Sequence, residues 1–200
     1  MHDDLIICLV GESGSGKTTL AQSLEHDQIY NIIHSYTTRP PRTEGEWGHT
    51  FKTFENEEEA QAYLHHARET DQLIAYTYFG GHHYWAERHQ YRGKGTSIYI
   101  IDPEGVKLIR QQVKDAKIVI IYLNTYPETR YCRLVEQYSP LYGMTEANDI
   151  AKQRIIRDAK MFTVIECDYC VPNNHDRIYA FNIVRDIINE ERAKEGRRLK

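Results

Sequence analysis

The chain has 200 residues, of which 40% are hydrophobic and 27% are charged, and its formal net charge is −4. This length suits one domain, or one domain with inserted lobes. A general nucleic-acid binder usually shows a basic excess, and a membrane-spanning helix needs ~20 consecutive apolar residues. The sequence has neither feature, so we expect neither nucleic acid nor a membrane as a partner.

The first strand-like run and the loop after it form the most informative stretch. The apolar run Leu5–Val10 predicts a buried parallel strand, and a helix-compatible segment starts at Lys17. Between them, Gly11–Thr19 has the sequence GESGSGKTT, which fits G-x-x-x-x-G-K-[ST] at every fixed position. A glycine loop before a helix N-terminus turns backbone N–H groups toward a phosphate. The pattern predicts a nucleoside triphosphate site.

The motif also predicts which side chains bind the ligand. Lys17 would reach the β- and γ-phosphates, and the Thr18 hydroxyl would ligate Mg²⁺. The expected nucleotide-binding residues of the loop are Gly11, Ser13, Gly14, Ser15, Gly16, Lys17, Thr18 and Thr19.

Strand-like and helix-like segments alternate along most of the chain. The expected strands are Leu5–Val10, Asn31–Ser35, Ser97–Ile101, Lys117–Leu123 and Tyr169–Val171. The expected helices are Lys17–Glu25, Pro103–Lys114, Pro127–Gln137, Glu146–Lys160 and Asp176–Arg192. This alternation is typical of an α/β domain with a parallel sheet. Pro140 and Gly143, between two charged helices, predict a mobile hinge or lid over Tyr138–Thr145.

The stretch from about Arg39 to Gly95 breaks this alternation. It holds a strand-like Thr50–Phe54, an acidic helix over Glu57–Arg68 and a tyrosine-rich extended run over Leu73–Phe79. We interpret it as an inserted small α+β lobe. The predicted division is then a P-loop core of residues 1–38 and 96–200, with a lid at about 127–160, and a lobe of residues 39–95.

The cysteines and the N-terminus bear on location. Cys167 and Cys170 form a single C-x-x-C pair, which is a weak zinc signal without a second pair. Cys170 falls in a strand-like run, where we expect a small buried thiol. The chain enters its first strand within a few residues and shows no signal peptide. We therefore expect reduced structural cysteines and a cytoplasmic protein.

A second constellation lies at Ser35–Arg42, which has the sequence SYTTRPPR and is followed by Gly45-Glu46. Two arginines three residues apart, stiffened by two prolines, suit a bidentate clamp on a phosphate. Taken alone, the segment suits a polar loop with incidental arginines equally well.

Together with the P-loop, this segment resembles the guanylate kinase family, which carries S-x-T-T-R-x-P-R followed by a G-E pair. The resemblance continues in order along nearly the whole chain, at Gly81–Tyr84 (G-x-x-Y), Ile98–Gly105 (I-L-D-I-D-x-x-G), Arg133-Leu134 (the lid R-L), Arg154–Ala159 (the second lid helix) and Asp168–Asn173 (D-Y-x-[IV]-x-N). It implies one guanylate-kinase-like domain over residues 1–200, with a P-loop core, an inserted monophosphate-binding lobe and a helical lid.

The resemblance also implies cofactors and roles. ATP and Mg²⁺ would be the cofactors, and Asn173 would lie near the adenine. The expected catalytic residues are Lys17, Arg42, Arg133, Arg154 and Arg157. The expected acceptor-binding positions are Ser35, Arg39, Arg42, Phe51, Ala75, Tyr84, Ala86 and Asp102.

The departures from the family fall where the acceptor base would sit. Ala75 replaces the glutamate that receives the guanine N1 and N2 hydrogens, Ala86 replaces a serine or threonine, and Phe51 replaces a phosphate-binding tyrosine. A charge-assisted hydrogen bond is worth about 1.5–3 kcal/mol, so losing the glutamate alone weakens guanine preference by roughly one to two decades. The lobe aromatics would stack on a base or, for most of them, pack the lobe core.

We expect an ATP-dependent nucleoside monophosphate kinase, a monomer or homodimer that acts on small-molecule nucleotides, with GMP or dGMP as the default acceptor. Three alternatives stay open. The acceptor is a pyrimidine or modified deoxynucleotide, or it is a sugar phosphate without a base, or the chain is a non-catalytic binding module. The complete P-loop disfavours the last.

Overall fold

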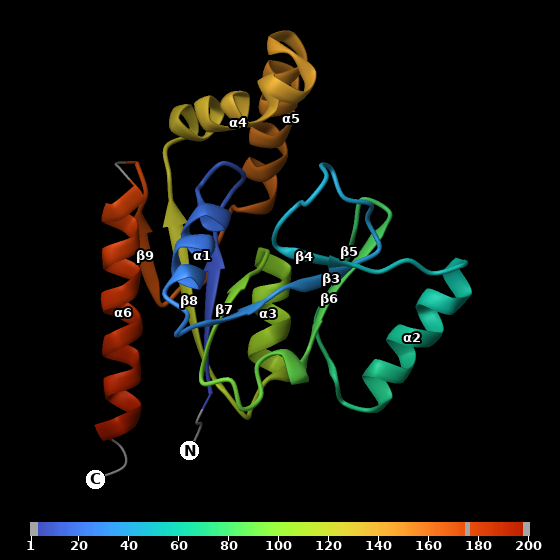
Figure 1. Ribbon diagram of the computed structural model, residues 1–200, viewed down its shortest axis with the longest axis vertical. Helices are drawn as coiled ribbons and strands as arrows, with labels where there is room; N and C mark the ends of the chain where they lie inside the picture. The colour runs from blue at the N-terminus through green and yellow to red at the C-terminus, as the bar shows by residue number, and fades with distance from the viewer. Residues whose placement is uncertain (1–3, 175–176, 198–200) are drawn as a thin grey trace. The chain divides into compact units, whose positions relative to one another are not determined.

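The computed structural model describes residues 4–174 and 177–197 (Figure 1). The chain forms two compact units. Unit 1 holds the residues up to Cys8 together with Glu25–Ile118, and unit 2 holds Leu9–Leu24 together with the chain from Val119 onward. The phosphate loop therefore belongs to unit 2, and the Ser35–Arg42 segment belongs to unit 1. The predicted boundaries of core, lobe and lid remain predictions.

A five-stranded sheet has the strand order β2-β7-β1-β8-β9, and its β2–β7 and β8–β9 pairs are parallel. Its strands are β1 (Leu5–Val10), β2 (Asn31–Ile33), β7 (Thr96–Ile100), β8 (Lys117–Asn124) and β9 (Tyr169–Pro172). Every residue of β1 is buried, as is typical of a central strand of a parallel sheet. The parallel sheet with its helices confirms the predicted α/β class with a P-loop core.

The second sheet lies within unit 1 and has the order β4-β3-β6-β5. Its strands are β3 (Ser35–Thr37), β4 (His49–Phe51), β5 (Leu73–Phe79) and β6 (His82–Glu87). The β3–β4 pair is parallel, and the β3–β6 and β5–β6 pairs are antiparallel. With its helix α2, this sheet forms the small α+β lobe that the sequence predicts.

The helices begin and end close to their predicted bounds. They are α1 (Lys17–His26), α2 (Glu57–Glu69), α3 (Pro103–Gln112), α4 (Pro127–Tyr142), α5 (Met144–Met161) and α6 (Arg177–Arg197). The predicted start of the last helix at Asp176 lies outside the described residues. Within the described residues, no helix combines the length and the apolar character that crossing a membrane requires.

Aromatic side chains fill the core of the lobe. Trp85 of β6 has no exposed surface and packs with Leu64 of α2, and its ring lies 5.4 Å from Tyr36 and 5.8 Å from Tyr63. The packing role expected for most of the lobe aromatics is therefore confirmed for Trp85.

Helix α2 of the lobe begins at the N-cap Asn56, whose side chain accepts a hydrogen bond from a first-turn N–H.

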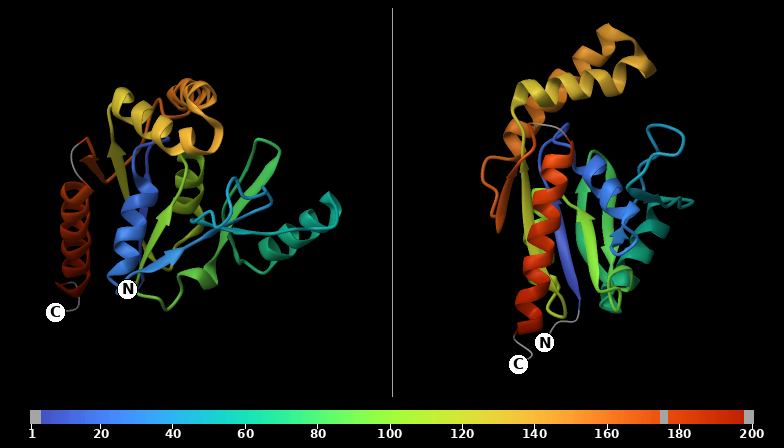
Figure 2. Two further views of the ribbon diagram at one scale, coloured as in Figure 1. Left: turned by 45° about the horizontal axis from the view of Figure 1, so that its top comes forward. Right: turned by 60° about the vertical axis from the view of Figure 1, so that its left-hand side comes forward.

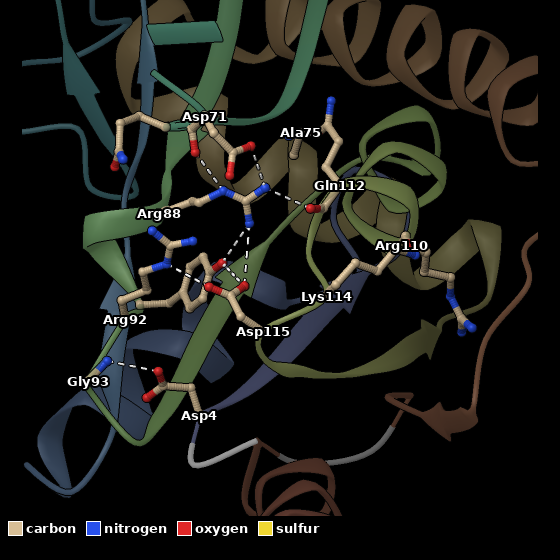
Figure 3. Close-up of polar contacts among 12 residues, drawn as sticks. Asp4, Asp71, Ala75, Arg88, Arg92, Gly93, Arg110, Gln112, Lys114 and Asp115 are labelled. Atoms are coloured by element: carbon tan, nitrogen blue, oxygen red, sulfur yellow. Dashed lines mark hydrogen bonds and ion pairs between the residues drawn. The ribbon is translucent and has the colours of Figure 1, made fainter. Parts of the chain in front are cut away.

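A buried arginine joins the lobe to the end of α3 within unit 1 (Figure 3). Arg88 is 5% exposed and donates to the main-chain oxygens of Asp71 and Gln112 at 2.6 and 2.7 Å. Its other donors reach the Asp71 carboxylate, the Tyr91 hydroxyl and the Asp115 carboxylate. The Arg88 guanidinium thus links the end of β6 to Asp71, which precedes β5, and to Gln112 at the end of α3 and Asp115 just after it.

Helices α4 and α5 form an antiparallel hairpin in unit 2 (Figure 2). Leu134, Tyr138, Ala147 and Ala151 form its buried core. Gly143 alone separates the two helices, and its φ of +79° lies in the left-handed region that favours glycine. Elsewhere in unit 2, α6 runs beside β9.

Two sequence expectations need correction, and a third stays a prediction. The mobile hinge or lid predicted over Tyr138–Thr145 stays a prediction, but α4 continues through Pro140 and only Gly143 breaks the helical path. The proline sits in the last turn of α4, where the loss of one backbone hydrogen bond is tolerated by the packed hairpin.

The predicted strand Asn31–Ser35 is two strands in two different sheets. β2 ends at Ile33, which pairs with Tyr99, and β3 begins at Ser35, which pairs with His49. The thiol of Cys170 is exposed rather than buried, because its neighbour Val171 is the β9 residue that faces the core.

Candidate functional site

The phosphate loop leads from β1 into α1, as predicted, and two of its glycines have no sterically tolerable substitute. Gly14 and Gly16 have φ values of +78° and +94°. A Cβ on Gly14 would lie 2.7 Å from the main-chain oxygen of Arg130, and one on Gly16 would lie 2.4 Å from the Asn173 amide nitrogen. These glycines therefore allow both the loop conformation and the close approach of α4 and of the end of β9.

The Lys17 ammonium is bonded to the loop that it follows. Its Nζ donates to the main-chain oxygens of Gly11 and Glu12 at 2.6 and 3.0 Å and to Ser15 Oγ at 3.3 Å. Burial lowers the pKa of Lys17 to about 8, although the Asp158 carboxylate opposes this shift. The side chain that the motif assigns to the phosphates thus lies over the loop, and it is still mostly charged at neutral pH although it holds its proton less tightly than an ordinary lysine.

The residues present fit a P-loop magnesium site. The Thr18 side chain is exposed, and Thr19 is half-buried one residue further along the helix. In the described ranges 4–174 and 177–197, no group of three or more His, Cys, Asp or Glu side chains could hold a metal ion. A P-loop magnesium ion needs no such group, because one hydroxyl and the phosphates of the substrate supply its ligands.

The three predicted lid arginines converge on the loop. Arg133 of α4 donates to Asn173 O at 3.0 Å and to Gly14 O at 3.4 Å. Arg154 and Arg157 of α5 donate to the Ser13 hydroxyl at 3.2 and 3.1 Å. Unit 2 therefore places four of the five predicted catalytic cations, these three and Lys17, around one loop.

The Asn173 side chain supports the phosphate loop through a hydrogen bond to its backbone. Its amide donates to the Ser15 main-chain oxygen at 2.7 Å, and the side chain is buried. The Thr125 hydroxyl donates to the same oxygen at 3.3 Å. This amide nitrogen is therefore committed to the loop backbone.

Sequence reasoning missed Asp158, which meets the loop most directly. Its Oδ2 accepts a hydrogen bond from the Ser13 main-chain N–H at 2.5 Å, and its Oδ1 accepts from Arg157 at 2.6 and 2.9 Å. Asp158 is 1% exposed. Burial alone would raise its pKa, but the hydrogen bonds from Ser13 and Arg157 hold the pKa below its usual value.

A second missed group is the ion pair of Glu12 and Arg130. Arg130 is 4% exposed, its Nη2 lies 3.6 Å from Glu12 Oε1, and its Nε donates to Thr125 O. Glu12 also accepts a hydrogen bond from the Tyr122 hydroxyl at 2.7 Å. Since Glu12 is the first variable residue of the motif, the pair ties the start of the loop to α4 and β8.

The predicted arginine clamp of unit 1 is organised by Glu46. The Arg39 guanidinium donates to both carboxylate oxygens of Glu46, at 2.7 and 3.1 Å. The Arg42 main-chain N–H donates to the same carboxylate at 2.6 Å, and its guanidinium lies 3.5 Å away. Arg39 is 10% exposed and its Nε has no hydrogen-bond partner among the described residues. The two arginines are thus gathered by one carboxylate.

Beside the clamp, Ser35 is paired with a histidine that the sequence reasoning missed. Ser35 Oγ lies 2.9 Å from His49 Nδ1, across the β3–β4 register pair. The His49 ring lies 6.0 Å from the rings of Phe51 and Tyr84. Burial, helped by the Arg39 cation, lowers the pKa of His49 to about 4, so the imidazole is neutral at pH 7.

Three positions expected to contact the acceptor base are Ala75, Ala86 and Asp102, and each has a defined environment within unit 1. Ala75 has a φ of +51°, lies at an irregularity of the β5–β6 ladder and donates its N–H to Gln112 Oε1 at 2.8 Å. Ala86 is fully buried. Asp102 caps α3 by accepting from Gly105 N at 2.7 Å, and Thr77 donates to its second oxygen at 3.4 Å. The Asp102 carboxylate is therefore already partnered within unit 1.

The parallel sheet and the glycine loop between β1 and α1 define a P-loop protein of the α/β class. The family described as AAA domain matches residues 7–154, so the chain belongs to that family. No curated protein matches the chain.

Among solved structures, a guanylate kinase from Anaplasma phagocytophilum is similar over 96% of this chain and 88% of its own, with a TM-score of 0.56 and 14% identity. A shikimate kinase from Bacteroides thetaiotaomicron is similar over 92% of this chain and 98% of its own, with a TM-score of 0.44 and 13% identity. At this identity, the likeness to the guanylate kinase concerns the fold.

Proposed function

We propose that this protein transfers the terminal phosphate of ATP to a nucleoside monophosphate. The observation that carries the proposal is the convergence of Lys17, Arg133, Arg154 and Arg157 on one glycine loop of unit 2. Phosphoryl transfer is catalysed mainly by positioning and by neutralising the charge on the moving group. Four cations around a phosphate loop supply that neutralisation.

On the donor side, the loop N–H groups and Lys17 hold the phosphates of ATP. Thr18 ligates Mg²⁺, which when bound neutralises part of the phosphate charge. We assign Asn173 to bracing the loop, because its amide donates to Ser15 O. Arg133 holds the same strand end through Asn173 O, and it is positioned to contact the phosphates from α4.

On the acceptor side, unit 1 binds the monophosphate through Arg39, Arg42 and the Tyr84 hydroxyl. Glu46 holds both arginines, and the buried, unpartnered Nε of Arg39 supports an anion partner for this group. Phe51 packs under the Arg39 guanidinium at 5.5 Å and gives it an apolar support in place of a hydroxyl. The default acceptor is GMP or dGMP.

The first experiment measures ATP consumption with Mg²⁺ against a panel of ribo- and deoxyribonucleoside monophosphates. Turnover of GMP or dGMP supports the default acceptor, and turnover of another monophosphate assigns Ala75 and Ala86 to a changed base specificity. Turnover of a sugar phosphate alone establishes the second alternative. Silence on every acceptor, with no binding of ATP and Mg²⁺ at millimolar concentration, contradicts the proposal and favours the binding-module alternative.

Two variants test the residue roles in the same assay. Lys17→Ala removes the ammonium from the phosphates and is expected to abolish turnover while the protein stays folded. Lys152→Ala is the matched control, since this lysine of α5 is 62% exposed and pairs only weakly with Asp149. Arg42→Ala is expected to raise the acceptor KM, and an unchanged KM removes Arg42 from the clamp.

A further inference from the structure

The carboxylate of Asp158 stands where the phosphate-binding groups of unit 2 meet. The Ser13 N–H of the loop and two guanidinium donors of Arg157 point at its oxygens. Arg154 donates to the Ser13 hydroxyl beside it, and the Lys17 ammonium is attracted to the same charge. The chain thus supplies its own anion to a loop whose sequence is typical of an anion site.

This arrangement sets a phosphate and the carboxylate in competition. A backbone amide has a single hydrogen, so the Ser13 N–H cannot serve Asp158 and a phosphate oxygen at full strength together. A phosphate that entered beside an ionised, 1% exposed carboxylate would also meet like-charge repulsion at close range. Arg154 and Arg157 lie on the same helix as Asp158, so both arginines and their competitor are carried by α5.

We propose that Asp158 is an internal ligand of the phosphate loop, which nucleotide phosphates must displace from Ser13, and that it thereby sets the nucleotide affinity of the protein. The inference rests on the donor half of the proposed function, nucleotide binding at the loop, and is independent of the acceptor. The proposal gives α5 a second role besides carrying Arg154 and Arg157. The helix also carries the Asp158 carboxylate, which bonds α5 to the phosphate loop until a nucleotide phosphate replaces it at Ser13.

The test is the affinity of Asp158→Asn for a non-hydrolysable ATP analogue with Mg²⁺, measured by titration calorimetry. The variant keeps the size of the side chain and removes its charge. A charge-assisted hydrogen bond is roughly twice as strong as a neutral one, so the competitor is weakened and the repulsion disappears. We expect the analogue to bind about tenfold more tightly than to the wild type.

The matched control is Asp149→Asn, which makes the same change of charge on the same helix. The Asp149 side chain is 65% exposed, and it pairs with Lys152 at 4.0 Å. Its affinity for the analogue is expected to equal that of the wild type. Equal tightening in both variants would reveal a general effect of charge and would overturn the proposal.

An affinity of Asp158→Asn that is unchanged or weaker also overturns the proposal, since Asp158 would then brace the site for the nucleotide. If the variant does not fold, a crystal structure of the wild-type protein with the same analogue tests the proposal instead. The expected result is that Ser13 N–H no longer donates to Asp158, and a bond that persists beside bound phosphates overturns the idea.

The outcome also separates this inference from the proposed function. If the wild type binds the analogue and Asp158→Asn binds it no more tightly, the proposed competition between Asp158 and phosphate is wrong, but nucleotide binding at the loop stands. If neither the wild type nor any variant binds the analogue, nucleotide binding at the loop is wrong and the competition is wrong with it.

Discussion

Protonation of Lys17 links nucleotide binding to pH. Burial lowers its pKa to about 8, while bound phosphates favour the charged form. We therefore expect the affinity for an ATP analogue to be nearly constant below about pH 7 and to fall by up to tenfold per pH unit above about pH 8. Calorimetric titrations between pH 6.5 and pH 9.5 measure this, as ~1 proton taken up per ligand at the alkaline end.

Lys17→Arg is the control for that pH dependence, because a guanidinium stays charged throughout the range. A variant that still binds should show a flat profile. A wild-type affinity that does not change up to pH 9.5 would contradict the shifted pKa. The same shift makes the unfolded state bind more protons between about pH 8 and pH 10.5, so this group's contribution to stability rises with pH in that window.

Ala75 is held in a conformation that L-residues avoid, and it stands at the position that the resemblance assigns to base recognition. Its φ of +51° is strained for any residue with a Cβ. We expect Ala75→Gly to raise the free energy of unfolding by about 0.5–1 kcal/mol, measured by chemical denaturation. The control is Ala86→Gly in the same hairpin, which removes a buried methyl group without relieving strain and should lower it.

The opposite change at this position tests base recognition. Ala75→Glu restores the carboxylate of the resembled family, and we expect it to raise GMP turnover relative to the other monophosphates. Ala75→Gln is the matched control, because it has the same shape without the charge that pairs with the guanine donors. An equal response to both variants, or none to either, would show that the register with the family is wrong.

At the scale of elements, Arg88 is the group whose loss should be felt most widely in unit 1 (Figure 3). Arg88→Met keeps the length of the side chain but leaves the main-chain oxygens of Asp71 and Gln112 without their donor. Because such buried acceptors cost about 1–3 kcal/mol each when unpaired, we expect a loss of about 2–4 kcal/mol in the free energy of unfolding.

Arg92→Met is the control for that measurement. Arg92 pairs with Asp115 at 2.6 Å, but its side chain is 45% exposed, and exposed ion pairs contribute about 0–1 kcal/mol. A loss of stability in Arg88→Met no larger than in Arg92→Met would show that water replaces the buried contacts.

The elements that the sequence predicted best are those whose signals are local. The sequence predicts a tyrosine-rich extended run over Leu73–Phe79, which is β5, because aromatic and β-branched residues favour a strand and Gly80-Gly81 end it. Tertiary packing decides the exceptions. Helix α4 passes through Pro140 because its hairpin with α5 stabilises the last turn, and no local signal shows that partner.

The same distinction separates the site residues. The phosphate loop is contiguous, so its motif identified Lys17 and the loop glycines from the sequence alone. Asp158 lies 145 residues from the Ser13 N–H that it accepts from, and His49 meets Ser35 only through the β3–β4 register. Pairings between remote segments leave no periodic pattern, so both residues were missed and only the structure brings them to their partners.

At the scale of the whole molecule, the donor residues lie in unit 2 and the acceptor clamp lies in unit 1. Each ligand should therefore protect its own unit from hydrogen exchange. We expect an ATP analogue to slow exchange in residues 11–19 and in α4 and α5, and an active monophosphate to slow it in residues 35–51. Mass spectrometry of the two complexes measures this. An acceptor that protects only unit 2 would contradict the assignment of the clamp.

The tryptophan fluorescence of this protein comes from one of its two units. Both of its tryptophans, Trp47 and Trp85, belong to unit 1. Trp85 is sealed in the lobe core, and Trp47 donates to Glu25 at 3.1 Å and meets the His34 ring edge-on. Intrinsic tryptophan emission thus reports on the lobe and its surroundings, while the phosphate loop and the α4–α5 hairpin contain no tryptophan. A fluorescence melt or titration that excites tryptophan selectively therefore reports on the surroundings of Trp47 and Trp85 in unit 1.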